Sequence, residues 1–316
     1  MDNSSYRNLY IEQLAEREGF TEKSAQAFQG LWNRIQRFEK SIGKTLEDGF
    51  MKEDYIKLFS YLNIMNVPTF LSTKSRIRKY LERLEEDGMV SQDTVAALVP
   101  VKYDDIDTSH IFELNYFKDF QSLQDTIVET LVAADKVDDS IYATQIAAIY
   151  MAWCGLQLEE ALSLMKSDVK DDCIVCNDKK ILPNSTIMEY MKDYRDATEY
   201  ESAARTIIKL KYIPSEYLFR TARSAHVDTP RVMRIFIRNF GKSAGDENGN
   251  MFHYDKVYWS GQYHRAYLYE SENGLIQHGD IETISRVFNE KYDSVSLANK
   301  RLQAYNKYKQ YFFPSK

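Results

Sequence analysis

The chain has 316 residues, enough for one large domain or two ordinary ones, each with its own hydrophobic core. Hydrophobic residues make up 44% of it and charged residues 28%, which excludes a disordered chain. No apolar run reaches the ~18 residues of a membrane helix, and the first residues have no secretion-signal pattern. Its 3 cysteines cannot form a disulfide framework, so we expect a cytoplasmic protein without a membrane partner.

Charge is distributed unevenly along the chain, although the net charge of −6 by itself argues mildly against nucleic acid. Residues 101–200 carry a net charge of −11, whereas residues 201–316 carry +6. Residues 205–242 include nine basic and two acidic side chains. Because the local field governs binding, this basic segment predicts a contact with nucleic acid.

Low contents of glycine (12) and proline (6) favour a mostly helical protein. In residues 1–99 we predict four or five short helices. One follows Thr21 and ends at Gly43, one lies within residues 51–65, and one is capped by Thr69 and ends before Gly88. The apolar face of this last helix is predicted to consist of Phe70, Thr73, Ile77, Leu81 and Leu84.

Residues 100–110 are polar and have no helical period, so we interpret them as a linker between two domains, 1–99 and 111–316. In the second domain, residues 173–183 predict a small hairpin that turns at Asn177-Asp178. Further helices are predicted at residues 117–134, 140–153, 158–166, 186–199, 229–239, 263–270, 281–289 and 294–311.

Basic residues recur along the helix predicted at 229–239. Arg231, Arg234 and Arg238 are three and four residues apart and Lys242 follows after another four, so they share one face. The buried side of this helix is predicted to hold Val232, Ile235, Phe236 and Phe240. Two other segments, 23–37 and 74–83, are also basic, and an ordinary solvated surface is the alternative to DNA contact. The residues predicted to contact DNA are Lys23, Arg34, Lys74, Arg78, Lys79, Arg83, Arg231, Arg234, Arg238, Lys242 and Arg265.

Metal and hydrolytic sites are not indicated. Cys173 and Cys176 have the spacing of a zinc-binding pair, but a structural zinc ion needs four ligands and no second pair accompanies them. Adjacent acids such as Glu159 and Glu160 do not share a helix face. The sequence has no glycine-rich phosphate loop and no Ser-His-Asp signature. We therefore predict no metal and no cofactor.

The segment Trp153–Val169 (WCGLQLEEALSLMKSDV) carries the most information in the chain. By its residues alone it is a glycine-interrupted pair of helices with an acidic face. It also resembles a box of the tyrosine recombinase (phage integrase) family, with Gly155, Glu160 and Asp168 at the family spacing. The resemblance extends over nearly the whole chain. It implies a mainly α, two-domain tyrosine-recombinase-like fold, with a helical SAM-like core-binding domain and a mostly helical catalytic-type domain that includes a small β-hairpin or sheet.

The chain departs from this family where the resemblance would place catalytic residues. Gln157 stands where the family has the arginine that clamps the scissile phosphate, and a neutral amide supplies no charge there. The second motif, His-x-x-Arg, falls within residues 260–265. One register puts Ser260 and Tyr263 at its two positions, and the other puts Gln262 and Arg265 there. The motif is incomplete in either register.

The last two catalytic positions are also changed. Residues 288–290 occupy the place of the family's histidine or tryptophan, and residues 297–299 occupy that of the nucleophilic tyrosine. Tyr292, Tyr305 and Tyr308 lie nearby but off the expected spacing. The resemblance implies that the protein is not an enzyme, because a tyrosine without a phosphate clamp is a weak nucleophile. The degenerate catalytic positions would be Gln157, Tyr263 and Asn299.

A chain that binds DNA without cleaving it suits a regulator. The chain is similar to the integrase-like repressors that hold lysogeny in SPbeta-group Bacillus phages. That resemblance implies a sequence-specific transcriptional repressor on double-stranded operator DNA, a scheme that would accommodate self-association and a phage antirepressor. Two alternatives stay open. One is a divergent active recombinase that uses Arg265 with Tyr305 or Tyr308. The other is a protein-interaction module whose partner surface is the acidic segment 101–200.

Overall fold

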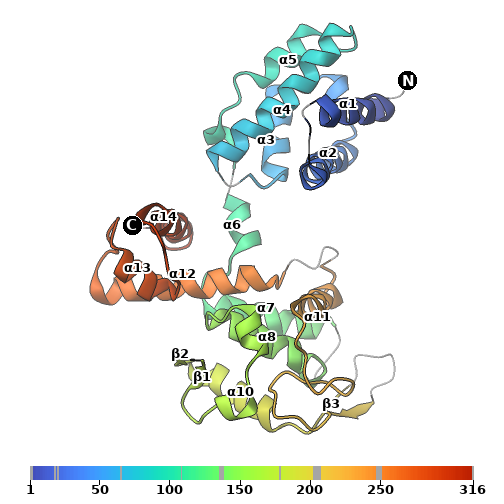
Figure 1. The fold of residues 1–316 in the computed structure, drawn as a ribbon. Coiled ribbons are helices and arrows are strands. Elements are labelled where there is room, and N and C mark those ends of the chain that lie inside the picture. The colour runs from blue at the N-terminus through green and yellow to red at the C-terminus, as the bar shows by residue number, and fades with distance from the viewer. Residues whose placement is uncertain are drawn as a thin grey trace. The chain divides into compact units, whose positions relative to one another are not determined.

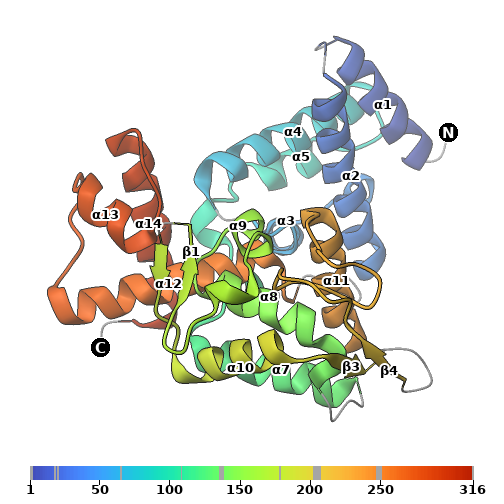
Figure 2. The same cartoon turned by 60° about the horizontal axis from the view of Figure 1, so that its bottom comes forward.

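The chain forms two compact units, Met1–Ile111 and Phe112–Lys316, and both are mainly helical (Figures 1 and 2). The mainly α fold class predicted from the sequence is confirmed. The computed structural model describes residues 3–17, 19, 21–64, 66–107, 109–134, 139–177, 179–201, 208–246 and 251–314. Among these residues, no helix is both long enough and apolar enough to cross a membrane.

Unit 1 is built from helices packed around one aromatic-rich core. Its helices are α1 (Asn3–Arg17), α2 (Glu22–Ile42), α3 (Lys52–Tyr61), α4 (Val67–Glu86) and α5 (Gln92–Leu98). Trp32 of α2 and Tyr80 of α4 are buried with their ring centroids 4.9 Å apart. The predicted ends of α2 are confirmed, because Thr21 caps its first turn and Gly43 ends it in the left-handed conformation.

The start of α4 was predicted wrongly. The helix begins at Val67, because the side chain of Asn66 accepts a hydrogen bond from the backbone N–H of Thr69, and Pro68 lies in the first turn. The predicted apolar face is confirmed and faces the core, with Phe70, Thr73, Ile77, Leu81 and Leu84 all buried.

A buried ion cluster fixes α1 on unit 1. The guanidinium of Arg7 donates to the carboxylates of Glu39 and Glu47 at 2.6 and 2.7 Å, and Tyr80 donates to Glu47. Arg7 and Glu39 are almost fully buried. A charged pair at that depth is tolerated because each charge has its partner and further hydrogen bonds.

The predicted linker is not an extended spacer. Val101 and Ile106 are buried in the core of unit 1, and residues 103–105 form a 3₁₀ turn between them. Helix α6 (Ser109–Asn115) follows directly, so the boundary between the units falls inside a helix. The two apolar side chains outweigh the polar composition that indicated a linker.

Unit 2 adds two short hairpins to its helices. The helices are α7 (Phe120–Ala133), α8 (Ala143–Trp153), α9 (Leu158–Leu162), α10 (Ser185–Asp196), α11 (Pro230–Ser243), α12 (Tyr254–Asn273), α13 (Ile281–Phe288) and α14 (Val295–Phe312). The strands are β1 (Ile174–Cys176), β2 (Lys179–Ile181), β3 (Glu199–Glu201) and β4 (Lys209–Lys211). In the predicted first hairpin, β1 and β2 are antiparallel, with Val175 opposite Lys180. The second hairpin, with Tyr200 opposite Leu210, was not predicted.

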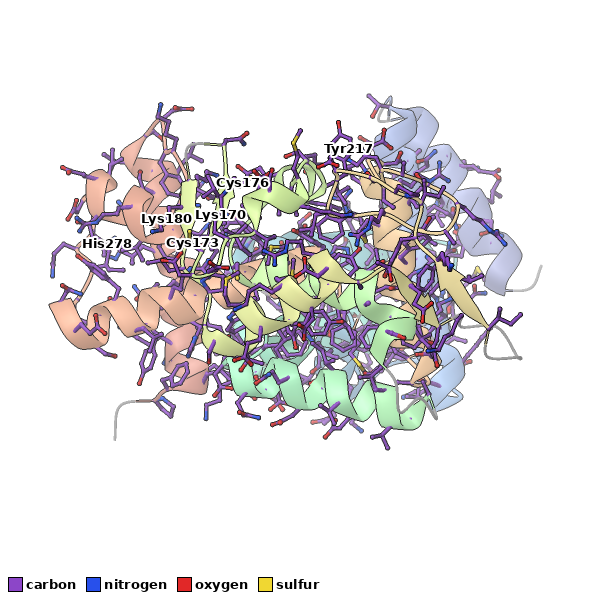
Figure 3. All side chains as sticks on the ribbon, turned by 90° about the horizontal axis from the view of Figure 1, so that it is seen from below. Lys170, Cys173, Cys176, Lys180, Tyr217 and His278 are labelled. Atoms are coloured by element: carbon purple, nitrogen blue, oxygen red, sulfur yellow. The ribbon has the colours of Figure 1, made fainter. Side chains whose placement is uncertain are left out.

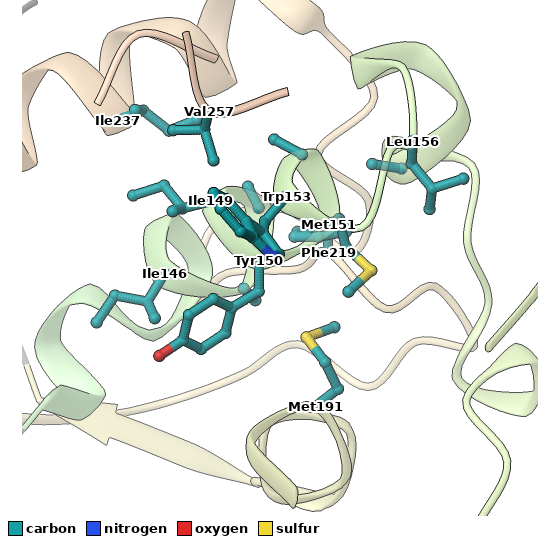
Figure 4. Packing of buried hydrophobic residues seen from close by; sticks show 14 of the residues in the cluster. Ile146, Ile149, Tyr150, Met151, Trp153, Leu156, Met191, Phe219, Ile237 and Val257 are labelled. Carbon is teal, nitrogen blue, oxygen red and sulfur yellow. The ribbon is translucent and has the colours of Figure 1, made fainter. Parts of the chain in front are cut away.

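Helix α8 forms the centre of unit 2. Every residue from Ile146 to Trp153 is buried, and the helix packs against α10, α11 and α12 (Figure 4). Phe120 of α7 contacts it through Trp153. Helix α12 approaches it most closely, because Gly261 has no side chain. A Cβ atom there would lie 2.1 Å from the carbonyl oxygen of Trp153.

Helix α12 is longer than predicted and joins two hydrophobic clusters. It begins at Tyr254 instead of Tyr263, and its first half packs into the α8 core. Its second half forms a separate cluster with α13 and α14. The start was missed because aromatic residues and Gly261 weaken the helical signal, while burial on two sides stabilises the helix.

Candidate nucleic-acid interface

The glycine of the recombinase-like box faces α12. Gly155 has φ +85°, and a Cβ there would lie 2.4 Å from Nη2 of Arg265 and 3.0 Å from Nε2 of Gln262. Tyr263 instead lies in the α12–α14 cluster, where its hydroxyl accepts from Arg301 at 3.1 Å. The structure therefore brings Gln262 and Arg265 to the box, and not Tyr263.

Arg265 is half-buried and hydrogen-bonded to a backbone carbonyl. Its Nη1 donates to the carbonyl oxygen of Trp153 at 2.6 Å, at the C-terminal end of α8. Burial lowers the pKa of Arg265. A guanidinium at a helix C-terminus satisfies a free carbonyl and interacts favourably with the helix dipole. In this position the half-buried Arg265 stabilises the end of α8, and its Nη1 is already used by a backbone acceptor.

Gln157 lies on the surface at the start of α9. Its backbone N–H donates to the carboxylate of Glu160 at 2.9 Å, and Lys179 of β2 donates to the same carboxylate at 2.5 Å. Glu160 thereby caps α9 and holds the first hairpin against it. At the position of the family's phosphate clamp, the surface has a neutral amide beside this ion pair.

A carboxylate occupies the third changed position. Glu290 accepts a hydrogen bond from the hydroxyl of Tyr292 at 2.7 Å and lies 3.5 Å from that of Tyr258. Burial, together with the charge of Glu290, raises the pKa of Tyr258 to about 12. Glu290 also pairs with Nε of Arg301 at 3.8 Å, so its charge has a cationic partner.

The candidate tyrosine nucleophiles near the C-terminus are buried in α14. Tyr305 donates to Glu270 at 2.7 Å, and Tyr308 donates to the backbone carbonyl of Phe117 at 3.1 Å. Burial raises the pKa of both tyrosines. Asn299 accepts from the backbone N–H of Gly279 at 2.9 Å. The hydroxyls of both tyrosines are therefore engaged as hydrogen-bond donors inside the protein.

The basic face of α11 is exposed as predicted. The side chains of Arg231, Arg234, Arg238 and Lys242 are exposed, and in the described part of the chain no salt bridge involves any of them. No acidic residue lies within the helix. These four residues form the α11 face, a surface that attracts phosphate oxygens.

The buried side of α11 was predicted partly wrongly. Met233, Ile237 and Phe240 are buried and Phe236 is half-buried, whereas Val232 and Ile235 are 37% and 39% exposed. The helical repeat explains the difference, because Ile235 lies nearly opposite the buried arc and Val232 lies outside it. Two apolar side chains therefore lie beside the arginines.

The basic residues of α4 are bound within unit 1. Lys74 donates to the backbone carbonyls of Val99 and Val101 at 2.8 and 2.7 Å. Arg78 pairs with Glu82 at 2.7 Å, and Arg83 pairs with Glu86 and Asp87 at 3.1 and 3.4 Å. Lys79 is exposed on the same helix.

The two basic residues predicted on α2 differ from those on α11. Arg34 donates to the backbone carbonyl of Leu62, and burial lowers its pKa. The side chain of Lys23 lies outside the described residues. The cations that the structure leaves most open for DNA are thus those of α11.

Another buried arginine precedes α11. Arg220 is fully buried and donates to the backbone carbonyls of Leu218, Arg195 and Ala197 at 2.9, 3.0 and 2.7 Å. Its guanidinium lies 4.7 Å from the ring centroid of Tyr212. Backbone acceptors at the end of α10 replace a carboxylate partner and make its burial tolerable.

The first hairpin presents lysines that the sequence analysis did not single out. Lys170 and Lys180 are exposed on it, near Cys173 and Cys176 (Figure 3). Both cysteines are buried, Cys176 at the end of β1 and Cys173 just before the strand begins. Among the described residues no group of three or more metal-binding side chains is gathered.

The solved structures that resemble the chain include the following two. The crystal structure of XerA recombinase matches 98% of this chain and 100% of its own, with 15% sequence identity and a TM-score of 0.40. The crystal structure of a lambda integrase dimer bound to a COC′ core site matches 95% of each chain, with 13% identity and a TM-score of 0.36. No family model and no curated protein matches the sequence.

Proposed function

We propose that this chain binds double-stranded DNA without cutting it and acts as a sequence-specific transcriptional repressor that maintains phage lysogeny. The α11 face carries the proposal, because its cations are exposed and no carboxylate of the described residues neutralises them. Arginines in this state donate to phosphate oxygens and to the edges of guanine.

Sequence preference is supported by the mixed chemistry of α11. Ile235 and Val232 are partly exposed beside the arginines, and Asn239 is exposed on the same side. In the major groove, arginine recognises guanine, asparagine recognises adenine and apolar groups contact the methyl of thymine. One helix therefore presents groups that distinguish base pairs together with groups that bind any phosphate.

The lack of cleavage is supported by the residues around the recombinase-like box. Gln157 offers no charge, and Arg265 is occupied by the carbonyl of Trp153. Glu290, in the place of the family's histidine or tryptophan, is neither a donor nor a cation and pairs with Arg301 at 3.8 Å. Electrostatic stabilisation of a charged transition state is the main requirement of phosphoryl transfer, and these residues do not supply it.

A binding assay with denatured controls tests the proposal. The protein would be mixed with fragments of its own genomic neighbourhood near physiological salt, with excess non-specific DNA. Half of each sample would then be denatured. We expect sharp shifts on few fragments and no covalent adduct. A covalent adduct would instead establish an active recombinase, and the absence of any shift at low salt would favour a protein-interaction module.

A pair of charge-reversal variants locates the surface. Arg234→Glu should weaken binding to every sequence, because it removes a phosphate contact and adds repulsion. Arg286→Glu makes the same charge change on α13, where Arg286 contacts Tyr269. Equal losses in both variants would show that overall charge, and not the α11 face, determines the affinity.

A further inference from the structure

We propose that the outer face of α7 is a docking surface for the α11 face of a second copy of this chain. On α7, Asp125, Val128, Glu129 and Val132 are three and four residues apart, so they share one side of the helix. Val128 and Val132 are 56% and 72% exposed. These four residues are called the α7 face.

The α7 face is apolar on the side that turns away from the core. The inner side of the helix already covers the core with Leu123, Ile127 and Thr130. Two adjacent exposed valines on the opposite side contribute nothing to that packing. Neighbouring apolar side chains bordered by charges are typical of surfaces that bind another protein.

The charge of the α7 face is uniformly negative. Helix α7 contains no basic residue, and among the described residues Glu129 takes part in no salt bridge. Tyr150 of α8 packs against both Phe120 of α7 and Tyr190 of α10, so both helices cover α8.

Helix α10, which also covers α8, is acidic on its exposed side as well. It exposes Glu189 and Asp193 next to one half-buried lysine, Lys192. The face therefore favours a partner that is basic and partly apolar.

The α11 face has the complementary pattern. Arg231, Arg234, Ile235 and Arg238 follow the same three- and four-residue spacing as the α7 face. Its arginines match the carboxylates, and Ile235 with Val232 matches the two valines. The same chain thus carries two surfaces that complement each other in charge, in apolar content and in helical repeat.

The resulting contact is head-to-tail. Each copy would give its α11 face to one neighbour and its α7 face to another, which produces rings or open chains instead of a symmetric pair. If α11 also binds DNA, as proposed above, DNA and the second copy would compete for it. That last consequence rests on the proposed function, whereas the contact itself does not.

Sedimentation of two single variants of the full chain tests the contact. We expect the wild type to form species larger than a monomer at low salt, which dissociate when salt screens the charges. Glu129→Lys and Arg234→Glu should each weaken association at least about tenfold, because each brings like charges together. When the two variants are mixed they should associate again, because each retains the surface that the other lacks.

A charge change outside the α7 face is the control for these variants. Glu282→Lys makes the same charge change on α13, where Glu282 is exposed outside the α7 face, and should leave most of the association intact. A wild type that sediments as a monomer at every salt and protein concentration would overturn the proposal. Association that persists in Glu129→Lys, or that does not return on mixing, would overturn it as well. None of these readouts uses DNA, so the proposed function is tested separately.

Discussion

Unit 2 uses arginine in two opposite ways. Arg220 is buried and Arg265 is half-buried, and they donate to backbone carbonyls at the ends of α10 and α8. Arg231, Arg234 and Arg238 are exposed on α11 and have no carboxylate partner among the described residues. The comparison shows that the hydrogen-bond acceptors of an arginine near a functional motif indicate its role. The first group should govern stability and the second group binding.

The largest effect should come from a side chain added at Gly261, where α12 lies against the end of α8. Gly261→Ala would place a Cβ 2.1 Å from the Trp153 carbonyl that accepts from Arg265. The helices must separate, and we expect a loss of about 3 kcal/mol in the free energy of unfolding, measured in urea. Gly30→Ala is the control, because nothing lies within 4 Å of its Cβ position, and it should be neutral or stabilising. A stable Gly261→Ala would contradict the close packing of α8 and α12.

Removal of the Arg220 guanidinium should reduce the free energy of unfolding slightly less. Arg220→Met leaves the carbonyls of Arg195 and Ala197 without their donor, which should destabilise the protein by roughly 2–3 kcal/mol. Arg231→Met removes a surface side chain, and its urea midpoint should match the wild type. If both variants unfold at the same denaturant concentration, the division between the two groups of arginines is wrong.

Restoration of an arginine at the recombinase-like box should change binding and not chemistry. Gln157→Arg places a cation on the surface, so DNA affinity should rise modestly. The slope of log affinity against log salt should steepen by about one phosphate contact. No covalent adduct should form on a nicked duplex, because Arg265 stays bonded to Trp153 and Tyr305 stays buried. An adduct with this single variant would show that only one catalytic residue had been lost.

The smallest effect should separate the two basic helices. Arg238→Ala on α11 should reduce the slope of log affinity against log salt by about one charge. Arg78→Ala should reduce it less, because that guanidinium already pairs with Glu82 at 2.7 Å. Equal slopes for the two variants would mean that the pairing on α4 opens in the complex.

The sequence predicted the fold class and the basic helix because both depend on local patterns. Few breakers and regular apolar spacing indicated helices, and the spacing of Arg231, Arg234 and Arg238 indicated one face. Helix ends were predicted where the cap was a single strong signal, as at Gly43. They were missed where two signals competed, as with Asn66 and Thr69.

Long-range partners could not be predicted from local patterns. Lys74 and Arg34 have the same local surroundings in sequence as a DNA-binding residue, yet backbone carbonyls far along the chain accept their hydrogen bonds. The same holds for Arg265, whose acceptor is a carbonyl of another helix. The choice between the two registers of residues 260–265 also required the structure, because it depends on which side of α12 faces Gly155.

Helix α12 belongs to two hydrophobic clusters, and this gives unit 2 two levels of cooperativity. Val257 is buried with the α8 core, while Tyr263 and Ala266 are buried with α13 and α14. The C-terminal cluster can therefore open while the α8 core stays folded. In native-state hydrogen exchange, the amides of α13 and α14 should exchange at a lower opening free energy than those of α8. The protection of the α12 amides should change partway along the helix, where α12 leaves the α8 core and enters the cluster with α13 and α14.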